Sequence, residues 1–152
     1  MRWIHSLSNR WSLFIAAILL AGCAGMGTSD GVQVRMTGAE EVPPVNTTAS
    51  GNGTVRVGED MSVSGSLKLQ NAAQILVAHI HVGAAGVVGP VIIPLRKIAD
   101  NEWEVPPGAK LTESQYQSYK AGGLYLNFHS AQYKGGEIRA QIRPSGGGSS
   151  GY

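Results

Sequence analysis

Short runs rich in valine and isoleucine, each broken by glycine, proline or asparagine, are the feature of this sequence that most restricts its fold. The breaks recur at intervals that suit short strands joined by turns. Seven such runs and little helix predict an all-β fold, an antiparallel β-sandwich of the immunoglobulin-like or Greek-key type. We expect strands at residues 32–36, 53–57, 62–69, 75–82, 88–94, 124–129 and 137–142.

A capping box predicts one short helix of about two turns. Thr112 stands at the expected N-cap, and Gln115 follows three residues later. Leu111 and Tyr116 are spaced as the flanking hydrophobic staple. Gly122 can close the helix in a left-handed turn.

The first residues have the pattern of a bacterial lipoprotein signal. Residues 1–11 contain two arginines and no acid, and residues 12–20 form an apolar run that is too short to cross a bilayer as a helix. The segment Leu20-Ala21-Gly22-Cys23 resembles a lipobox, in which the cysteine is lipidated and becomes the new N-terminus. We therefore expect a signal peptide at residues 1–22, a lipid anchor on Cys23, and a location in the bacterial cell envelope, facing the periplasm or the cell surface.

The remaining chain is expected to form one domain on a tether. Residues 23–31 are small and polar, residues 32–144 hold the predicted strands, and residues 145–152 have too little apolar surface to order. Removal of residues 1–22 lowers the Lys+Arg count from 12 to 10, which equals the 10 Asp+Glu. A neutral chain argues against a nucleic-acid partner, because phosphate binding needs surplus positive charge. Cys23 is the only cysteine, so no intramolecular disulfide can form.

Three histidines of the mature chain are the candidates for chemistry. His79 and His81 form an H-x-H pair on a predicted strand, where a period of two puts both imidazoles on one face. His129 on another predicted strand would complete a three-nitrogen site with an open position. Such a site suits copper, with zinc as the second choice. The alternative is a hydrogen-bonded surface pair without a metal.

Polar residues near these histidines could orient an imidazole or steer an anion. Asn127 shares the face of His129, while Glu137, Arg139 and Gln141 share one face of the last predicted strand. Each could equally belong to a solvated strand face. For Gln141 the solvated face is the favoured interpretation.

Ordered sequence blocks across residues 34–143 resemble the chordin-type (CHRD) domain family. The resemblance implies a β-sandwich module, which occurs in bacterial secreted proteins and in animal chordin. It indicates the fold better than the function. The blocks are Gly38-Ala39-Glu40-Glu41-Val42-Pro43-Pro44-Val45, Ala78-His79-Ile80-His81-Val82-Gly83, Gly86 with Gly89-Pro90, Asn127-Phe128-His129, and Gly135-Gly136-Glu137-Ile138-Arg139.

Residues 53–82 also resemble the early strands of Cu,Zn superoxide dismutase, which lead into that family's own H-x-H pair. The resemblance implies copper at the three histidines, and it places Arg139 near the position of the arginine that guides superoxide. The family's bridging histidine would fall at Val91, and its other zinc ligands and its disulfide have no counterpart here. The implied site is a copper site that lacks the zinc half.

Three hypotheses about function follow. The first is a lipid-anchored copper-binding protein, with a role in copper handling or in superoxide or other redox chemistry, and binding is favoured over catalysis. The second is a non-enzymatic cell-surface interaction module with structural histidines, which would need an exposed aromatic or apolar patch. The third, a zinc hydrolase with Glu137 as base, ranks last because neither H-E-x-x-H nor paired carboxylates occur.

Overall fold

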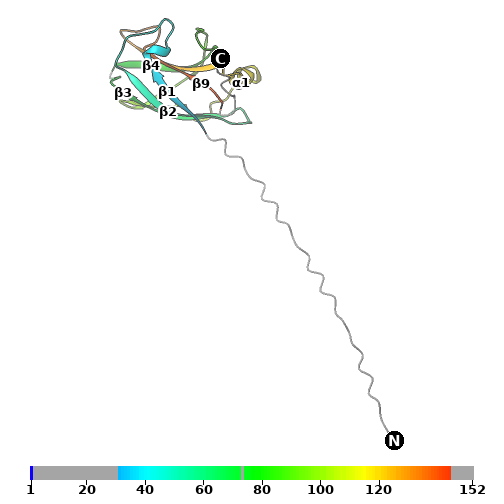
Figure 1. Ribbon diagram of the computed structural model, residues 1–152. Helices are drawn as coiled ribbons and strands as arrows, with labels where there is room; N and C mark the ends of the chain where they lie inside the picture. Colours follow the sequence, from blue (N-terminus) through cyan, green and yellow to red (C-terminus); the bar gives the residue numbers. More distant parts are fainter. Residues whose placement is uncertain (2–30, 73, 145–152) are drawn as a thin grey trace.

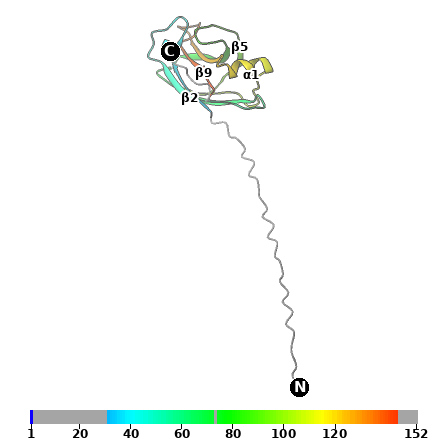
Figure 2. The same ribbon diagram turned by 45° about the vertical axis from the view of Figure 1, so that its right-hand side comes forward.

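The computed structural model describes Met1, residues 31–72 and residues 74–144, and this part of the chain is nearly all β-structure with one short α-helix (Figures 1 and 2). Its strands form one antiparallel sheet in the order β5-β4-β8-β9-β1-β2-β3-β7-β6. The sheet curls around its core into a sandwich that is nearly a barrel. The predicted all-β fold is confirmed. The predicted signal peptide, Cys23, most of the tether and the tail lie outside the described residues.

The sequence predicted seven of the nine strands, each with bounds within three residues of those observed. The two missed strands, β6 and β7, are short and carry charged side chains, and β6 is exposed throughout. They therefore lack the run of buried apolar residues that marks a strand in a sequence. The strands are β1 Val32–Thr37, β2 Ser50–Val57, β3 Val63–Gln70, β4 Ile75–Val82, β5 Val91–Pro94, β6 Arg96–Ala99, β7 Glu102–Glu104, β8 Leu124–Ser130 and β9 Ile138–Ile142, with a 3-10 turn η1 at Gly38–Glu40.

The two edge strands of the sheet are connected directly in the sequence. The edge strands β5 and β6 are consecutive in the sequence, with only Leu95 between them. The Leu95 backbone N–H donates to the Ala78 carbonyl at 2.8 Å. Both edge strands are only four residues long, which leaves little free strand edge for unwanted pairing.

Strand β8 is buried on both of its faces, and this positions the candidate site. On the inner face Phe128 packs edge-to-face against Trp103, with ring centroids 5.8 Å apart. On the outer face Tyr125 and Asn127 are also buried, although they are polar. The sandwich therefore has a second, polar layer outside its sheet, where loops cover β8.

Helix α1 (Glu113–Lys120) lies at one end of the sandwich (Figure 1). The predicted capping box is present, since the Thr112 hydroxyl accepts from Gln115 N–H and the Gln115 side chain accepts from Thr112 N–H. Gly122 follows with a φ of 71° and donates its N–H to the Tyr119 carbonyl, which closes the helix. In the described part of the chain, no helix has the length and apolar character needed to span a membrane.

Replacing Thr112 with alanine is expected to lower the free energy of unfolding by about 1 kcal/mol, because the hydroxyl that accepts from Gln115 N–H is lost. Urea denaturation followed by circular dichroism measures the change. Thr48→Ala removes the same atoms from an exposed loop threonine and serves as the control. Equal losses in the two variants would show that the cap contributes nothing specific.

Candidate metal centre

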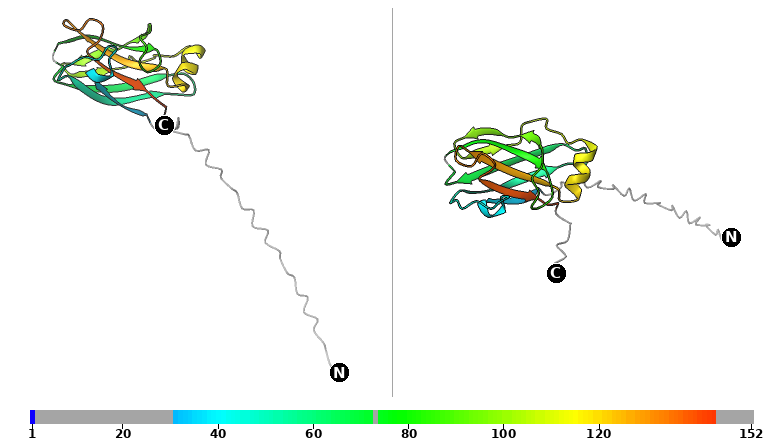
Figure 3. Two further views of the ribbon diagram at one scale, coloured as in Figure 1. Left: turned by 45° about the horizontal axis from the view of Figure 1, so that its top comes forward. Right: turned by 90° about the horizontal axis from the view of Figure 1, so that it is seen from above.

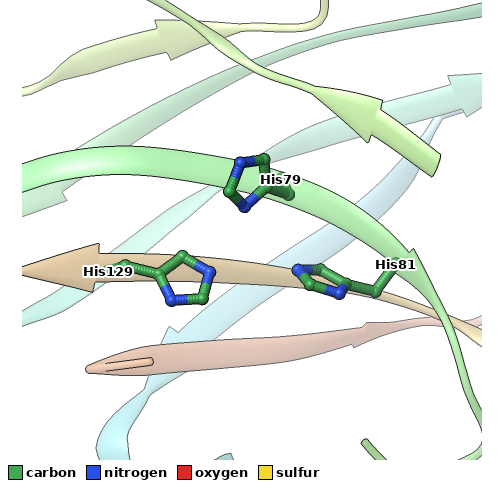
Figure 4. Close-up of side chains that lie close together, drawn as sticks. All are labelled: His79, His81 and His129. Carbon is green, nitrogen blue, oxygen red and sulfur yellow. The ribbon is translucent and has the colours of Figure 1, made fainter. Parts of the chain in front are cut away.

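Strand periodicity brings His79, His81 and His129 together on the outer face of the sheet. In β4 the two histidines alternate with Ala78 and Ile80, whose side chains are buried in the core. In the neighbouring strand β8, His129 pairs directly with Val77 in the register. The antiparallel pairing therefore places His129 one step along the same face from the H-x-H pair, and Figure 4 shows the three rings converging.

Each histidine contributes one buried ring nitrogen that has no hydrogen-bond partner. These atoms are Nδ1 of His79 and Nε2 of both His81 and His129. One ligand nitrogen from each ring lies within 4.8 Å of the others. Buried polar atoms normally find a partner, so these three nitrogens are available to bind a metal ion.

Backbone carbonyls orient two of the three rings. Nδ1 of His81 lies 2.9 Å from the Gly89 carbonyl, and Nδ1 of His129 lies 3.0 Å from the Lys134 carbonyl. A carbonyl can only accept, so in the neutral ring Nδ1 carries the proton and Nε2 keeps its lone pair. This arrangement is the one in which an outer hydrogen bond fixes the tautomer of a metal-binding histidine.

Burial favours the neutral forms of His79 and His81. The pKa of His79 is lowered from its ordinary value, first by burial and then by the positive charge that His129 and His81 would carry. The pKa of His81 is also lowered, mainly by burial, although its hydrogen bond to Gly89 opposes the shift. Neutral imidazoles are the forms that bind metal ions.

The three nitrogens fit one metal ion after a small adjustment. Two nitrogens that each bind an ion at about 2.1 Å are at most about 4.2 Å apart. The observed spacing of up to 4.8 Å would fall within that range after slight rotations of the half-buried rings of His79 and His129. The histidines could therefore hold a metal ion, with further positions left open.

Tyr125 stacks between the site and a buried arginine. Its ring is nearly parallel to that of His81, at an interplanar angle of 12° and a centroid distance of 4.8 Å. The guanidinium carbon of Arg139 lies 3.5 Å from the centroid of the same Tyr125 ring. Arg139 is only 2 % exposed, so its charge acts inside the polar layer rather than at the surface.

The other expected neighbours have partners of their own. Asn127 donates to Glu41 Oε2 and to the Gly135 carbonyl, at 3.5 and 3.4 Å. Glu137 accepts from the Thr47 hydroxyl at 2.7 Å.

The expectation that Gln141 lies on a solvated face is wrong. Its amide donates to the carbonyls of Gly83 and Gly122, both at 2.8 Å. These carbonyls belong to loops that fold over the face of β9, so the side chain is used to hold them. Strand periodicity gave the correct face, but it could not show that loops cover it.

Glu41 is a buried acidic group near the site that the sequence does not single out. Its side chain is 5 % exposed, and burial raises its pKa from 4.5 to about 7, although the positive charge of Arg139 opposes this shift. Its Oε1 has no hydrogen-bond partner. Glu40 and Glu41 are adjacent in the sequence and both belong to one of the CHRD-like blocks. The sequence does not show which of the two is buried.

The fold and the site together define an antiparallel β-sandwich with a candidate three-histidine metal site on its outer face. The chain belongs to the CHRD domain family, because the family model matches residues 32–142. The predicted resemblance to that family is confirmed. No curated protein and no solved structure matches the chain, so the resemblance to Cu,Zn superoxide dismutase stays a prediction.

Proposed function

We propose that this protein is a lipid-anchored copper-binding member of the CHRD family, which takes one copper ion on His79, His81 and His129. The observation that carries the proposal is the convergence of three buried, unpartnered ring nitrogens on one face. In His81 and His129, the hydrogen bond at Nδ1 leaves Nε2 with its lone pair free to bind a metal ion. Its role would lie in copper handling or in redox chemistry at the cell envelope.

The ligand chemistry favours copper over zinc. All three ligands are imidazoles, which bind both ions well, and copper(II) binds more tightly than zinc to a given set of nitrogen ligands. Structural zinc sites usually complete a tetrahedron with four protein ligands, whereas the described residues supply three here. An open position would admit a water, a small anion or a ligand from a partner that delivers or removes the ion.

The position of Arg139 favours copper binding over superoxide catalysis. An arginine that guides an anion to a metal must present its charge to the approach path. Arg139 instead lies under the loop between β4 and β5, where it donates to the carbonyls of Ala84 and Val87 at 3.2 and 3.0 Å. Its guanidinium thus supports the loop beside the histidines.

The anchor proposal rests on the sequence before the domain. The lipobox-like segment ends at Cys23, and the described domain begins at Gly31, eight residues later. A chain of that length spans at most about 28 Å when extended. The domain would therefore stay close to the membrane that holds the lipid. Mass spectrometry of the protein extracted from membranes tests for the diacylated cysteine.

Copper titration of the chain that begins at residue 23 and carries Cys23→Ser tests the metal site, because this change removes the only thiol. Calorimetry is expected to show one tightly bound Cu(II) per chain, and electron paramagnetic resonance is expected to show nitrogen couplings. The double variant His79→Ala/His81→Ala is expected to lose affinity by about 100-fold or more. Titration with zinc under the same conditions should give the weaker binding.

The control variant Val77→Ala/Val91→Ala changes two exposed residues that pair across the strands with His129 and His81. It should bind copper like the wild type. If the wild-type chain binds no more tightly than the histidine variant, the copper proposal fails. The chain would then be a surface interaction module in which the histidines are structural.

A further inference from the structure

The loop between β4 and β5 exposes a run of small and apolar side chains. Residues 84–88 read Ala-Ala-Gly-Val-Val, and every one of them is exposed. Val87 is 51 % exposed and Val88 is 68 % exposed. Apolar surface of this kind on a folded chain commonly marks a contact with a partner or a membrane.

Several backbone groups of the same loop have partners within the domain. The carbonyls of Ala84 and Val87 accept from Arg139, and the Gly89 carbonyl faces Nδ1 of His81. The Gly89 N–H donates to the Tyr125 hydroxyl at 3.0 Å. Each backbone group that is bonded within the domain lowers the cost of bringing the loop into contact with an apolar phase.

The loop lies at the end of the sandwich where the tether joins the domain. The register pairs Val82 with Leu124 and Leu124 with Ile142, so the loop after β4 emerges beside the end of β9. The antiparallel pairing of β1 with β9 places the start of β1 toward the same end. The left panel of Figure 3 shows β1 beginning at the end of the sandwich where α1 lies.

Two cations flank the loop at this end. Lys120 and Arg143 are exposed and line one shallow hollow together with Ala84 and Ala85. Asp60 sits in the loop between β2 and β3, on the other side of the sandwich, where Lys110 lies 3.8 Å away. At this end of the sandwich, the surface near β4, β8 and β9 therefore combines exposed valines with positive charge.

We propose that this loop and its two cations form a docking surface for the anionic lipid bilayer, with Val87 and Val88 entering the interface and Lys120 and Arg143 facing lipid phosphates. This inference deepens the proposed lipid anchor and rests on it for the orientation of the domain. The short tether holds this end within about 28 Å of the bilayer. Apolar insertion and electrostatic attraction together are the usual basis of binding at a membrane surface.

Vesicle binding tests the surface without the anchor. The chain that begins at residue 23 and carries Cys23→Ser is mixed with vesicles of phosphatidylglycerol and phosphatidylethanolamine, or of phosphatidylcholine alone, and sedimented. We expect binding to the anionic vesicles, and a loss of about tenfold in partitioning for Val87→Ser/Val88→Ser. Lys120→Ala/Arg143→Ala should weaken binding and reduce its dependence on salt.

Matched control variants remove the same kinds of side chain at other places on the surface. Leu76→Ser/Ile98→Ser removes two other exposed apolar side chains, and Arg35→Ala/Lys97→Ala removes two other exposed cations. Both controls should bind anionic vesicles like the parent. If the loop variants and the controls lose binding equally, the docking surface is not this loop.

A single-cysteine label reports insertion directly, because the Cys23→Ser chain has no other thiol. An environment-sensitive dye on Val88→Cys should shift to shorter wavelengths with anionic vesicles, whereas the same dye on Gln70→Cys, at the far end of β3, should not. Circular dichroism confirms that each labelled chain is folded. No vesicle binding and no shift at residue 88 would overturn the docking proposal, while detection of diacylated Cys23 would leave the anchor standing.

Discussion

Replacing His129 with alanine is expected to lower the affinity for copper by about 100-fold or more, although this residue lies on a different strand from the H-x-H pair. The loss removes one of three ligand nitrogens, and the remaining pair cannot hold the ion in the same geometry. Calorimetric titration of the Cys23→Ser chain, with and without the change, measures the difference. The nitrogen couplings in the paramagnetic resonance spectrum should change at the same time.

The control for this change is Val77→Ala, which shortens the cross-strand partner of His129 and leaves all three rings in place. Its copper affinity should equal that of the parent chain. An unchanged affinity in His129→Ala would reduce the site to the histidine pair of β4. That result would contradict the three-histidine proposal without removing copper binding itself.

Replacing Glu41 with glutamine is expected to remove about 3 kcal/mol of pH dependence from the free energy of unfolding. Folding raises the pKa of Glu41 from 4.5 to about 7, mainly through burial. The folded chain therefore holds this proton more tightly than the unfolded chain does. The stability from this group is fully present below pH 4.5 and is lost as the pH rises through about 7.

Urea denaturation of the metal-free chain across this pH range gives the comparison. Taking the difference between the two proteins cancels the titration of groups that they share, such as His79. Glu40→Gln is the matched control, because Glu40 is the exposed neighbour on the same turn. The expectation is contradicted if the stability gap between wild type and Glu41→Gln stays constant with pH.

The parts of this structure that depend on local periodicity could be predicted from the sequence. The strand period placed His79 and His81 on one face, and the spacing of Thr112 and Gln115 located the helix. The convergence of His129 depended on knowing that β4 and β8 are neighbours, which is a non-local fact. The sequence indicates His129 only because it is the one other histidine after residue 22, and the register of β4 with β8 supplies the physical basis.

The burial of the polar layer could not be predicted in the same way. A strand pattern shows which side chains share a face, but it does not show which loops fold over that face. Arg139 and Gln141 were expected on a common face of the last strand, and the structure adds the covering carbonyls that they bind. The burial of Glu41 could not be predicted, because it depends on the contact between the end of η1 and β8, where Asn127 donates to Glu41.

The pairing of the first strand with the last strand governs how this chain can be made. β1 lies between β9 and β2, and its contact with β9 joins positions about 100 residues apart. A ribosome delivers the chain from its N-terminus, so β1 keeps one unpaired edge until the final strand has emerged. Completion of the fold must therefore wait until β9 has been synthesised. A chain truncated before Ile138 would leave β1 and β8 both without a partner on one side, and such open edges promote aggregation.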